Sequence, residues 1–363
     1  MEYRTLPHGG EKISVIGLGA GSLTGTEEEM TAVLDAAIQG GINYFDIAPS
    51  VRAPFFAYAK AFEGRREQVI TQMHFGAVYQ SEEYGWTRDL DAIKAQFAWQ
   101  LKLLNTDYTD VGFLHCVDDL DDLDTVMNGG LWDYMKSLKA LGTIRHLGFS
   151  SHNPDIARRI LDTGLVDLFM FSINPAYDYQ SEDEYAIGEV AERAALYRDA
   201  QRMGVGISVM KPFAGGQLLD EKTSLFKRAL THTQCFQYAL DRPGVLTVLP
   251  GVRNMEDLRT VLKYAEATAE EKDYSVIGEF APQDATGICV YCNHCQPCPM
   301  GLNVGLINKY YDLALAGDVL AKGHYQKLPI HADACIRCGH CESRCPFHVK
   351  QESRMEEIAQ YFQ

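Results

Sequence analysis

The chain has 363 residues, of which 46% are hydrophobic and 23% charged, and its formal net charge is −16. These values exclude low-complexity disorder as the main state, and the acidic balance makes nucleic acid and anionic membranes poor partners. Met1–Gly10 has charged residues and no apolar block, and no run approaches the ~18 apolar residues of a membrane span. We therefore expect a cytoplasmic protein that acts on a small molecule.

Short apolar runs alternate with amphipathic stretches through the first 270 residues. The runs expected to be buried parallel strands are Val15–Leu18, Asn43–Asp46, Val69–Thr71, Val111–His115, Ile144–Phe149, Asp167–Ile173, Val205–Met210 and Leu246–Leu249. A helix is expected to start at the acidic segment Thr26–Glu29 and to end at Gly40 and Gly41. The other helical stretches are Leu90–Leu104, Leu131–Leu141, Glu184–Met203, Leu225–Leu240 and Asn254–Ala265. Eight strand–helix units predict a (β/α)₈ TIM barrel, with a hairpin of Tyr3–Leu6 and Lys12–Val15 across its floor.

The cysteine content divides the chain into two parts. Eight of its ten cysteines lie between Cys289 and Cys345, and the first 288 residues contain only Cys116 and Cys235. We predict a barrel at 1–270, a linker at 271–287 and a small, mainly helical iron–sulfur domain at 288–363. The two isolated cysteines are interpreted as ordinary buried thiols, although Cys116 directly follows His115 at a strand end.

The cysteines of the second part form two runs. They are Cys289-x₂-Cys292-x₂-Cys295-x₂-Cys298-Pro299 and Cys335-x₂-Cys338-x₂-Cys341-x₃-Cys345-Pro346. The second run has the spacing of two-cluster bacterial ferredoxins, in which the cysteine before proline binds the other cluster. The pattern therefore predicts two 4Fe–4S clusters.

Exchange of the last cysteines assigns one cluster to Cys289, Cys292, Cys295 and Cys345, and the other to Cys335, Cys338, Cys341 and Cys298. The exchange stays open, because the first run is one residue shorter before its last cysteine. A pair of Cys₄ zinc sites is the alternative, but zinc sites usually join two C-x₂-C pairs across a longer spacer.

Polar residues occupy the predicted carboxyl ends of the strands, where barrels of this kind bind substrates. They are Asp46, Gln72, His74, His115, Ser150, His152, Asn174, Lys211 and Arg253. The stretches Gly41–Ser50, Val111–His115, Ile144–Ser150, Met210–Gly216 and Leu249–Asn254 resemble the aldo/keto reductase family, in its branch with a two-cluster ferredoxin domain. The resemblance implies NAD(P)H-dependent carbonyl reduction by an Asp, Tyr, Lys and His tetrad, in which the tyrosine protonates the carbonyl oxygen.

Two members of that tetrad are replaced. Asp46 and His115 match the family pattern, but Val51 occupies the tyrosine position and Gln72 the lysine position. Valine has no proton to donate and glutamine has no charge, so the acid must come from another residue. The residues that can replace it are Tyr58, Tyr79, Tyr84, Lys211, His74 and Arg52.

The candidate catalytic residues are therefore Asp46, His115, Arg52, Gln72, His74 and Lys211. Arg52 and Lys211 are the expected new partners of Asp46, and together they predict a cationic pocket for an acidic substrate. His152 is either part of this site or a hydrogen-bonded loop histidine.

A phosphate-bearing cofactor is expected at the last two strand ends. The helix that starts beside Gly251, Arg253 and Asn254 offers backbone N–H groups to a phosphate, and Gly215 and Gly216 permit a close approach. Ser150 also keeps its family identity, whereas the neighbouring asparagine and the nicotinamide-binding glutamine of the family are Ser151 and Met170. The resemblance implies NAD(P)H, and flavin mononucleotide is an alternative for which the sequence has no motif.

Iron–sulfur clusters transfer single electrons, whereas nicotinamide transfers a hydride. Our leading hypothesis is an oxidoreductase of an anaerobe that passes electrons through two clusters to a small carbonyl or unsaturated substrate, with a ferredoxin or flavodoxin as redox partner. The first alternative is an NADPH-dependent carbonyl reductase with a relocated acid and structural clusters. The second is a non-catalytic electron-transfer or redox-sensing subunit.

Overall fold

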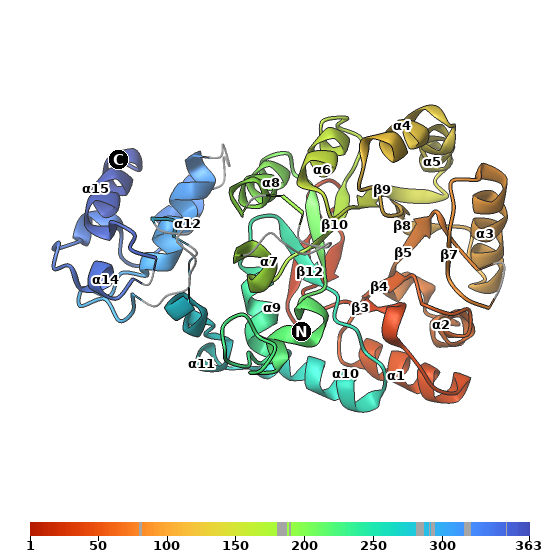
Figure 1. Ribbon diagram of the computed structural model, residues 1–363, viewed down its shortest axis with the longest axis horizontal. Helices are drawn as coiled ribbons and strands as arrows, with labels where there is room; N and C mark the ends of the chain where they lie inside the picture. The colour runs from red at the N-terminus through yellow and green to blue at the C-terminus, as the bar shows by residue number, and fades with distance from the viewer. Residues whose placement is uncertain are drawn as a thin grey trace.

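The computed structural model describes residues 1–79, 82–179, 187–188, 190–280, 287–289, 291, 295–315, 321–345 and 347–363. Within these ranges, eight parallel strands follow one another in chain order around a barrel (Figure 1). They are β3 (Leu18–Gly19), β4 (Tyr44–Ile47), β5 (Ile70–Phe75), β8 (Thr109–Leu114), β9 (Ile144–Ser150), β10 (Leu168–Ser172), β11 (Gly206–Met210) and β12 (Val245–Val248). The predicted (β/α)₈ barrel is confirmed.

The barrel closes between its first and last strands. Ile16 pairs with Val248, and Gly19 pairs with Gly251, in parallel bridges. A Cβ atom at Gly17 would lie 2.6 Å from Leu249 Cδ2 and 3.0 Å from the backbone carbonyl of Tyr44, so a larger residue would require these neighbours to shift. Two short antiparallel hairpins accompany the barrel: β1 (Tyr3–Thr5) with β2 (Lys12–Ser14), and β6 (Ala77–Val78) with β7 (Gly85–Trp86).

Helices surround the strands, as expected for this architecture. In the barrel they are α1 (Glu27–Gln39), α2 (Pro54–Phe62), α3 (Leu90–Leu103), α4 (Leu120–Asn128), α5 (Leu131–Ala140), α6 (Pro154–Leu161), α7 (Pro175–Tyr179), α8 (Val190–Arg202), α9 (His232–Leu240) and α10 (Met255–Leu262). Four of these, α2, α4, α6 and α7, lie outside the predicted stretches. The helix predicted from Leu225 starts only at His232, because Thr231 and Gln234 form a capping box there.

The first half of the predicted linker packs on the barrel. Helix α11 (Ala269–Lys272) and a 3₁₀ helix at Ser275–Phe280 occupy it, and Tyr274 and Ile277 are buried in the barrel's core. The cysteine-containing domain follows with α12 (Val304–Leu315), α13 (Ala321–Gln326), α14 (His340–Ser343) and α15 (Gln351–Tyr361). No helix in the described part of the chain is long and apolar enough to cross a membrane.

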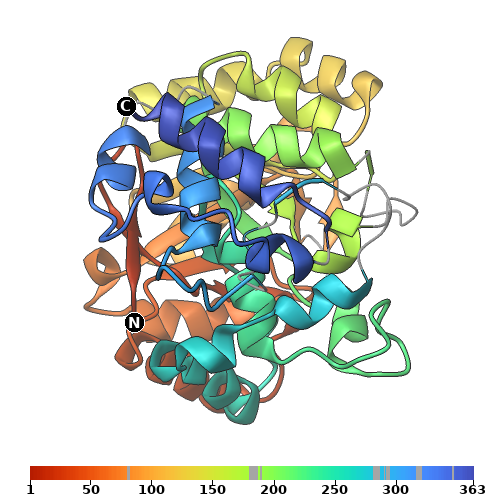
Figure 2. The same cartoon turned by 90° about the vertical axis from the view of Figure 1, so that its left-hand side faces the viewer.

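The cysteine-containing domain lies against one side of the barrel. Figure 1 shows it beside α8, α9 and α11, and Figure 2 shows the same domain from its outer face. Phe347 and Val349 of this domain join the hydrophobic core of the barrel. Strands β4, β5 and β8 lie on the opposite side of the barrel from this domain (Figure 1).

Candidate functional site

Three adjacent strands bring the polar residues of the barrel mouth together. Side chains alternate along a strand, so Tyr44 and Asp46 share one face of β4, and Gln72 and His74 share one face of β5. The register pairs Asp46 with Gln72. His115 follows β8, and its backbone N–H donates to the carbonyl of Phe75 at the end of β5.

Asp46 forms its hydrogen bonds with residues of β5. Its Oδ1 atom lies 2.7 Å from His74 Nε2 and accepts a hydrogen bond from Gln72 Nε2 at 2.9 Å. The expected partners Arg52 and Lys211 are therefore replaced in this role by His74 and Gln72. Two hydrogen-bonding side chains on the adjacent strand take the place of a lysine.

Tyr44 orients this part of the site and was not among the predicted site residues. Its buried hydroxyl donates to Gln72 Oε1, which turns the amide nitrogen of Gln72 toward Asp46. The alternation of strand residues could have identified it, because it lies two positions before Asp46.

A chain of hydrogen bonds runs from Asp46 to an exposed tyrosine. His74 Nδ1 lies 2.8 Å from His115 Nδ1, and His115 Nε2 lies 2.7 Å from the hydroxyl of Tyr84. We assign the His74 proton to Nε2 because the Asp46 carboxylate accepts there. It follows that His115 donates from Nδ1 and accepts the Tyr84 proton at Nε2. We call Asp46, His74, His115 and Tyr84 the relay.

Backbone pairing places Tyr84 at the mouth of the barrel. Val51 forms an antiparallel bridge with Glu83, and the Tyr84 N–H donates to the carbonyl of Ser50 at 3.1 Å. Tyr84 therefore lies beside the segment whose family tyrosine is replaced by Val51. It is 42% exposed, which leaves its hydroxyl accessible to a ligand.

The other two candidate tyrosines do not join the relay. Tyr79 donates to the carbonyl of Pro49 at 2.6 Å. Tyr58 is fully buried, with its ring against Phe45 and Phe62. Burial raises the pKa of both phenols, so neither is suited to proton exchange.

The predicted cationic residues Arg52 and Lys211 have other surroundings. The guanidinium of Arg52 lies over the Trp99 ring, 4.5 Å from its centroid. Lys211 has a left-handed backbone, with φ of 54°, and its carbonyl accepts a hydrogen bond from Asn174 Nδ2 at 2.8 Å. Asn174 thus supports the turn that carries Lys211 at the rim.

The relay carries no buried cation at His115. Burial lowers the pKa of His115 well below its ordinary value, and the nearby His74 and Arg88 lower it further. Burial also raises the pKa of Tyr84, as does the neighbouring Cys116, while Arg88 opposes the shift. The two groups therefore meet as a neutral imidazole and a neutral phenol.

A second part of the mouth is an open cleft of about 940 Å³. Gly215, Gly216, Gly251 and Lys211 line it. Gly215 and Gly216 have positive φ values of 67° and 94°, with open space where a Cβ would be, so the backbone is accessible to a ligand. Ser150 lies elsewhere: its hydroxyl accepts the N–H of Cys116 at 2.8 Å.

The start of α10 is already hydrogen-bonded within the chain. Asn254 accepts the N–H groups of Glu256 and Asp257, and Asp257 accepts the backbone and guanidinium N–H groups of Arg253. Arg253 is exposed, so its guanidinium can exchange this carboxylate for a phosphate. The cleft and Arg253 fit a phosphate-bearing nucleotide, although Asp257 competes for the arginine.

Four cysteines from the two runs meet at one cavity. Cys298 lines it together with Cys335, Cys338 and Cys341. The Arg337 N–H donates to Cys335 Sγ at 3.5 Å, a contact that suits a cluster-bound sulfur. This set equals one of the two predicted ligand groups, including the exchanged Cys298, and it fits a 4Fe–4S cluster.

The other predicted ligand group is only partly described. Cys289 and Cys345 both contact the core cluster of the barrel, and the Gly287 N–H donates to the carbonyl of Phe347 at 2.6 Å. Cys295 instead packs in the apolar cluster that includes Cys341. Cys292 lies outside the described residues.

Family models match both parts of the chain. The aldo/keto reductase family model matches residues 15–234, and the 4Fe-4S binding domain model matches residues 328–351. Among curated proteins, the uncharacterized oxidoreductase YqkF of Bacillus subtilis (strain 168) is 26% identical over 309 residues, which cover 78% of this chain and 98% of that protein.

Solved structures share the barrel. The holo form of aldo-keto reductase AKR11C1 from Bacillus halodurans has a TM-score of 0.62 at 24% identity, covering 78% of this chain and 97% of that one. An aldo/keto reductase from Klebsiella pneumoniae, solved in complex with NADP and acetate, has a TM-score of 0.54 at 19% identity, with coverage of 78% and 97%. The chain is therefore an oxidoreductase that belongs to the aldo/keto reductase family and has a C-terminal 4Fe–4S binding domain.

Proposed function

We propose that this protein catalyses the NAD(P)H-dependent reduction of a small carbonyl compound, and the reverse oxidation, with Tyr84 as a relocated general acid. The relay carries this proposal, because it connects an exposed phenol to the family aspartate through two histidines. The geometry thus favours the first alternative drawn from the sequence. The cofactor-bearing relative from Klebsiella pneumoniae supports the choice of NADP(H).

Bound NAD(P)H supplies a hydride to the carbonyl carbon. In alcohol oxidation, the relay starts from the Asp46 carboxylate. The Tyr84 proton moves to His115 Nε2, the His115 Nδ1 proton moves to His74 Nδ1, and the His74 Nε2 proton moves to Asp46, while the phenolate takes the proton of the alcohol. Carbonyl reduction is the reverse: it starts with Asp46 protonated and both histidines in the opposite tautomers, the carbonyl oxygen takes the hydroxyl proton of Tyr84, and the outward shift replaces it. Water at the exposed tyrosine supplies the added proton before reduction and takes it up after oxidation.

Replacement of Tyr84 by phenylalanine tests this assignment. Under anaerobic conditions, we expect Tyr84→Phe to lower kcat for NAD(P)H-dependent reduction of small aldehydes and ketones by about 10²- to 10⁴-fold, with a smaller change in KM. Tyr79→Phe is the matched control, because it removes a neighbouring hydroxyl outside the relay. Equal losses in the two variants would refute the role of Tyr84, and no turnover by the isolated wild-type chain would favour the non-catalytic subunit.

The cavity of four cysteines supports a second function for the C-terminal domain. We infer that Cys298, Cys335, Cys338 and Cys341 hold one 4Fe–4S cluster, and that Cys289, Cys292, Cys295 and Cys345 hold another. Clusters supply single electrons when bound. Their domain lies on the side of the barrel away from strands β4, β5 and β8, beside the helices that follow β10 and β11 (Figure 1).

Loss of one cluster separates an electron-transfer role from a structural role. Cys298→Ser and Cys335→Ser should each lower the iron content by about half and remove the same spectroscopic signal, because both cysteines line one cavity. If the clusters are structural, NAD(P)H-dependent turnover persists in both variants. Loss of turnover in both, with an intact fold by circular dichroism, would instead favour a barrel supplied with electrons by its clusters.

A further inference from the structure

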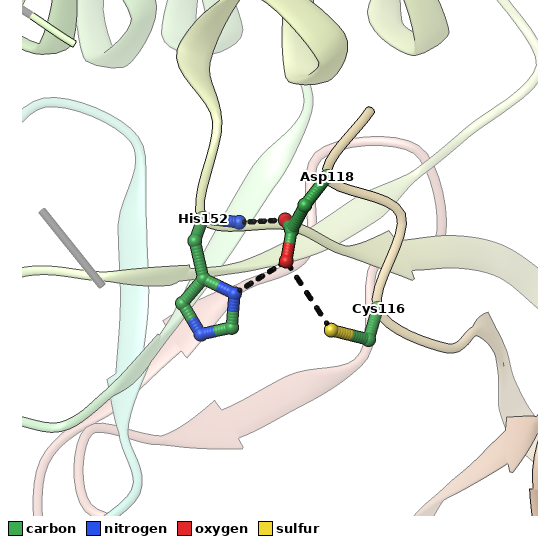
Figure 3. Close-up of side chains that lie close together, drawn as sticks. All are labelled: Cys116, Asp118 and His152. Atoms are coloured by element: carbon green, nitrogen blue, oxygen red, sulfur yellow. Dashed lines mark hydrogen bonds and ion pairs between the residues drawn. The ribbon is translucent and has the colours of Figure 1, made fainter. Parts of the chain in front are cut away.

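A second group of polar side chains lies at the barrel mouth, beside the relay. Cys116 and Asp118 follow β8, and His152 follows the neighbouring strand β9 (Figure 3). Asp118 Oδ2 accepts hydrogen bonds from Cys116 Sγ at 3.3 Å and His152 Nδ1 at 2.9 Å. One sulfur, one oxygen and one nitrogen atom thus lie within 4.8 Å of one another.

The carboxylate is held so that one of its oxygens faces the other two groups. Its Oδ1 atom accepts the backbone N–H of His152 at 2.6 Å and the hydroxyl of Ser151 at 3.1 Å. Asn153 Nδ2 also donates to the backbone carbonyl of Asp118 at 3.0 Å. These bonds fix the carboxylate through Oδ1 and leave Oδ2 directed at the thiol and the imidazole.

The thiol is held by a strained backbone. Cys116 has a φ of 47°, in the left-handed region that residues other than glycine rarely adopt. Its N–H donates to the Ser150 hydroxyl at 2.8 Å, and its carbonyl accepts a hydrogen bond from Arg88 at 3.0 Å. Strain of this kind persists only where surrounding contacts impose it, and here it directs the thiol toward Asp118.

We propose that Cys116, Asp118 and His152 bind a zinc ion at the barrel mouth, separately from the iron–sulfur clusters. Thiolate, carboxylate and imidazole are the ligand types of zinc, and bond lengths of about 2.0–2.3 Å place tetrahedral ligands about 3.3–3.6 Å apart. The two short distances to Asp118 Oδ2 therefore need only a small outward movement. Three protein ligands leave a fourth position for water or a substrate oxygen, the arrangement of catalytic zinc sites.

Binding of the ion has a defined proton balance. The Cys116 thiol releases one proton to solvent when the thiolate coordinates. The His152 proton moves from Nδ1 to Nε2, so that Nδ1 faces the metal. Ser151 and the His152 amide keep their bonds to Asp118 Oδ1 and act as the outer support of the site.

Calorimetric titration of the full-length, cluster-containing protein with ZnCl₂ tests the proposal, under anaerobic conditions and with a non-thiol reductant. We expect one zinc ion per wild-type chain. Cys116→Ser and Asp118→Asn should weaken binding by more than about 100-fold, and Ser151→Ala by about 10-fold. Cys235→Ser is the control for loss of a thiol, because Cys235 is buried in α9; it should bind zinc like the wild type.

A second measurement locates the ion directly and does not depend on the variants folding. Crystals of the full chain soaked in ZnCl₂ should show an anomalous peak at the zinc edge between Cys116 Sγ, Asp118 Oδ2 and His152 Nδ1. The proposal is overturned if the wild type binds no zinc, if Cys116→Ser binds it equally well, or if the peak lies only at the cluster cysteines. Neither measurement uses turnover, so both are independent of the role of Tyr84.

Discussion

The two ends of the barrel contain buried histidines and carboxylates in opposite electrostatic arrangements. At the floor, His146 lies 2.9 Å from Glu11 and 3.2 Å from Asp167, and Lys139 donates to Asp167 at 2.6 Å. At the mouth, the relay has two histidines for its single carboxylate, Asp46. At the floor, two acids, Glu11 and Asp167, instead surround one buried histidine, and the half-exposed His8 also lies 3.4 Å from Asp167.

The number of acids around a histidine determines whether that histidine carries a charge. At the floor, burial lowers the pKa of His146, but the hydrogen bonds that it donates to Asp167 and Glu11 outweigh burial and raise the pKa overall. Burial likewise raises the pKa of Asp167, but the bonds from His146 and Lys139 lower it to about 2. His115 donates no hydrogen bond to a carboxylate; burial lowers its pKa, and the nearby Asp118 does not offset that shift. The floor holds fixed ion pairs, whereas the mouth keeps neutral groups that can transfer protons.

The largest expected effect is at the mouth, on turnover. Asp46→Asn should lower kcat by about 10³-fold, because the new amide can donate to His74 Nε2 and so favour the wrong tautomers along the relay. The measurement is steady-state reduction of the best carbonyl substrate found for the wild type. A loss of less than tenfold would show that the tautomers of the relay do not control proton transfer.

The matched substitution at the floor should affect stability instead. Asp167→Asn removes the shared partner of His146 and Lys139, so we expect the free energy of unfolding to fall by about 2–3 kcal/mol. Turnover at a temperature where the variant is folded should stay within about twofold of the wild type. Denaturant titration and steady-state kinetics on the same preparation check both parts, and a large loss of kcat would contradict the division between floor and mouth.

The stability that the floor residues contribute should also depend on pH. Folding lowers the pKa values of Glu11 and Asp167. Their contribution to the free energy of unfolding is therefore complete above their pKa values in the unfolded chain, near 4.5 and 3.8. It is lost as the pH falls through their lower pKa values in the folded protein. Folding raises the pKa of His146, so its contribution to the free energy of unfolding is complete below pH 6.5. That contribution is lost as the pH rises through the pKa of His146 in the folded protein.

A comparison of the wild type with His146→Gln measures this dependence. The wild type should be more stable than the variant by about 1–2 kcal/mol between about pH 5 and 6.5. This difference should become smaller both below and above that pH range. Thermal unfolding across this pH range gives the profile. A difference that grows steadily above pH 8 would mean that His146 is neutral in the folded protein, like His115.

The smallest effect is expected at the rim of the cofactor cleft. Asp257→Ala frees Arg253 from its exposed ion pair, so NADPH should bind about two- to fivefold more tightly at low salt. Salt screening should reduce the gain at about 0.5 M NaCl. Fluorescence titration with NADPH measures both conditions, and unchanged affinity at low salt would show that the phosphates do not reach Arg253.

Much of the barrel could be predicted because its signals are local. Each strand is a short apolar run between stretches of helical periodicity, and all eight predicted runs overlap or adjoin the observed strands. Helices α2 and α6 were missed because they are only nine and eight residues long, although the prolines at their starts, Pro54 and Pro154, are compatible with a first helical turn. The spacing of the cysteines also made them candidate ligands, but it left open whether Cys298 belongs with Cys335, Cys338 and Cys341, with which it lines one cavity.

The candidate site could be predicted only in part. Asp46, Gln72, His74 and His115 were identified because each lies at the carboxyl end of a predicted strand. The sequence left three tyrosines as candidate acids, and it assigned Arg52 or Lys211 to Asp46. Contacts between β4 and β5 decide the partners of Asp46, and no local pattern reports them.

By itself, the sequence determined the eight-stranded barrel, the two cysteine runs and the loss of the family tyrosine and lysine, because these depend on residue identity and on spacing along the chain. Only the tertiary structure decided that Tyr84 completes the relay and that Cys116, Asp118 and His152 face one another. The pairing of Val51 with Glu83 and the proximity of β8 to β9 bring together residues more than 30 positions apart. Such contacts depend on how the strands pack around one barrel, and that packing is set by the whole chain.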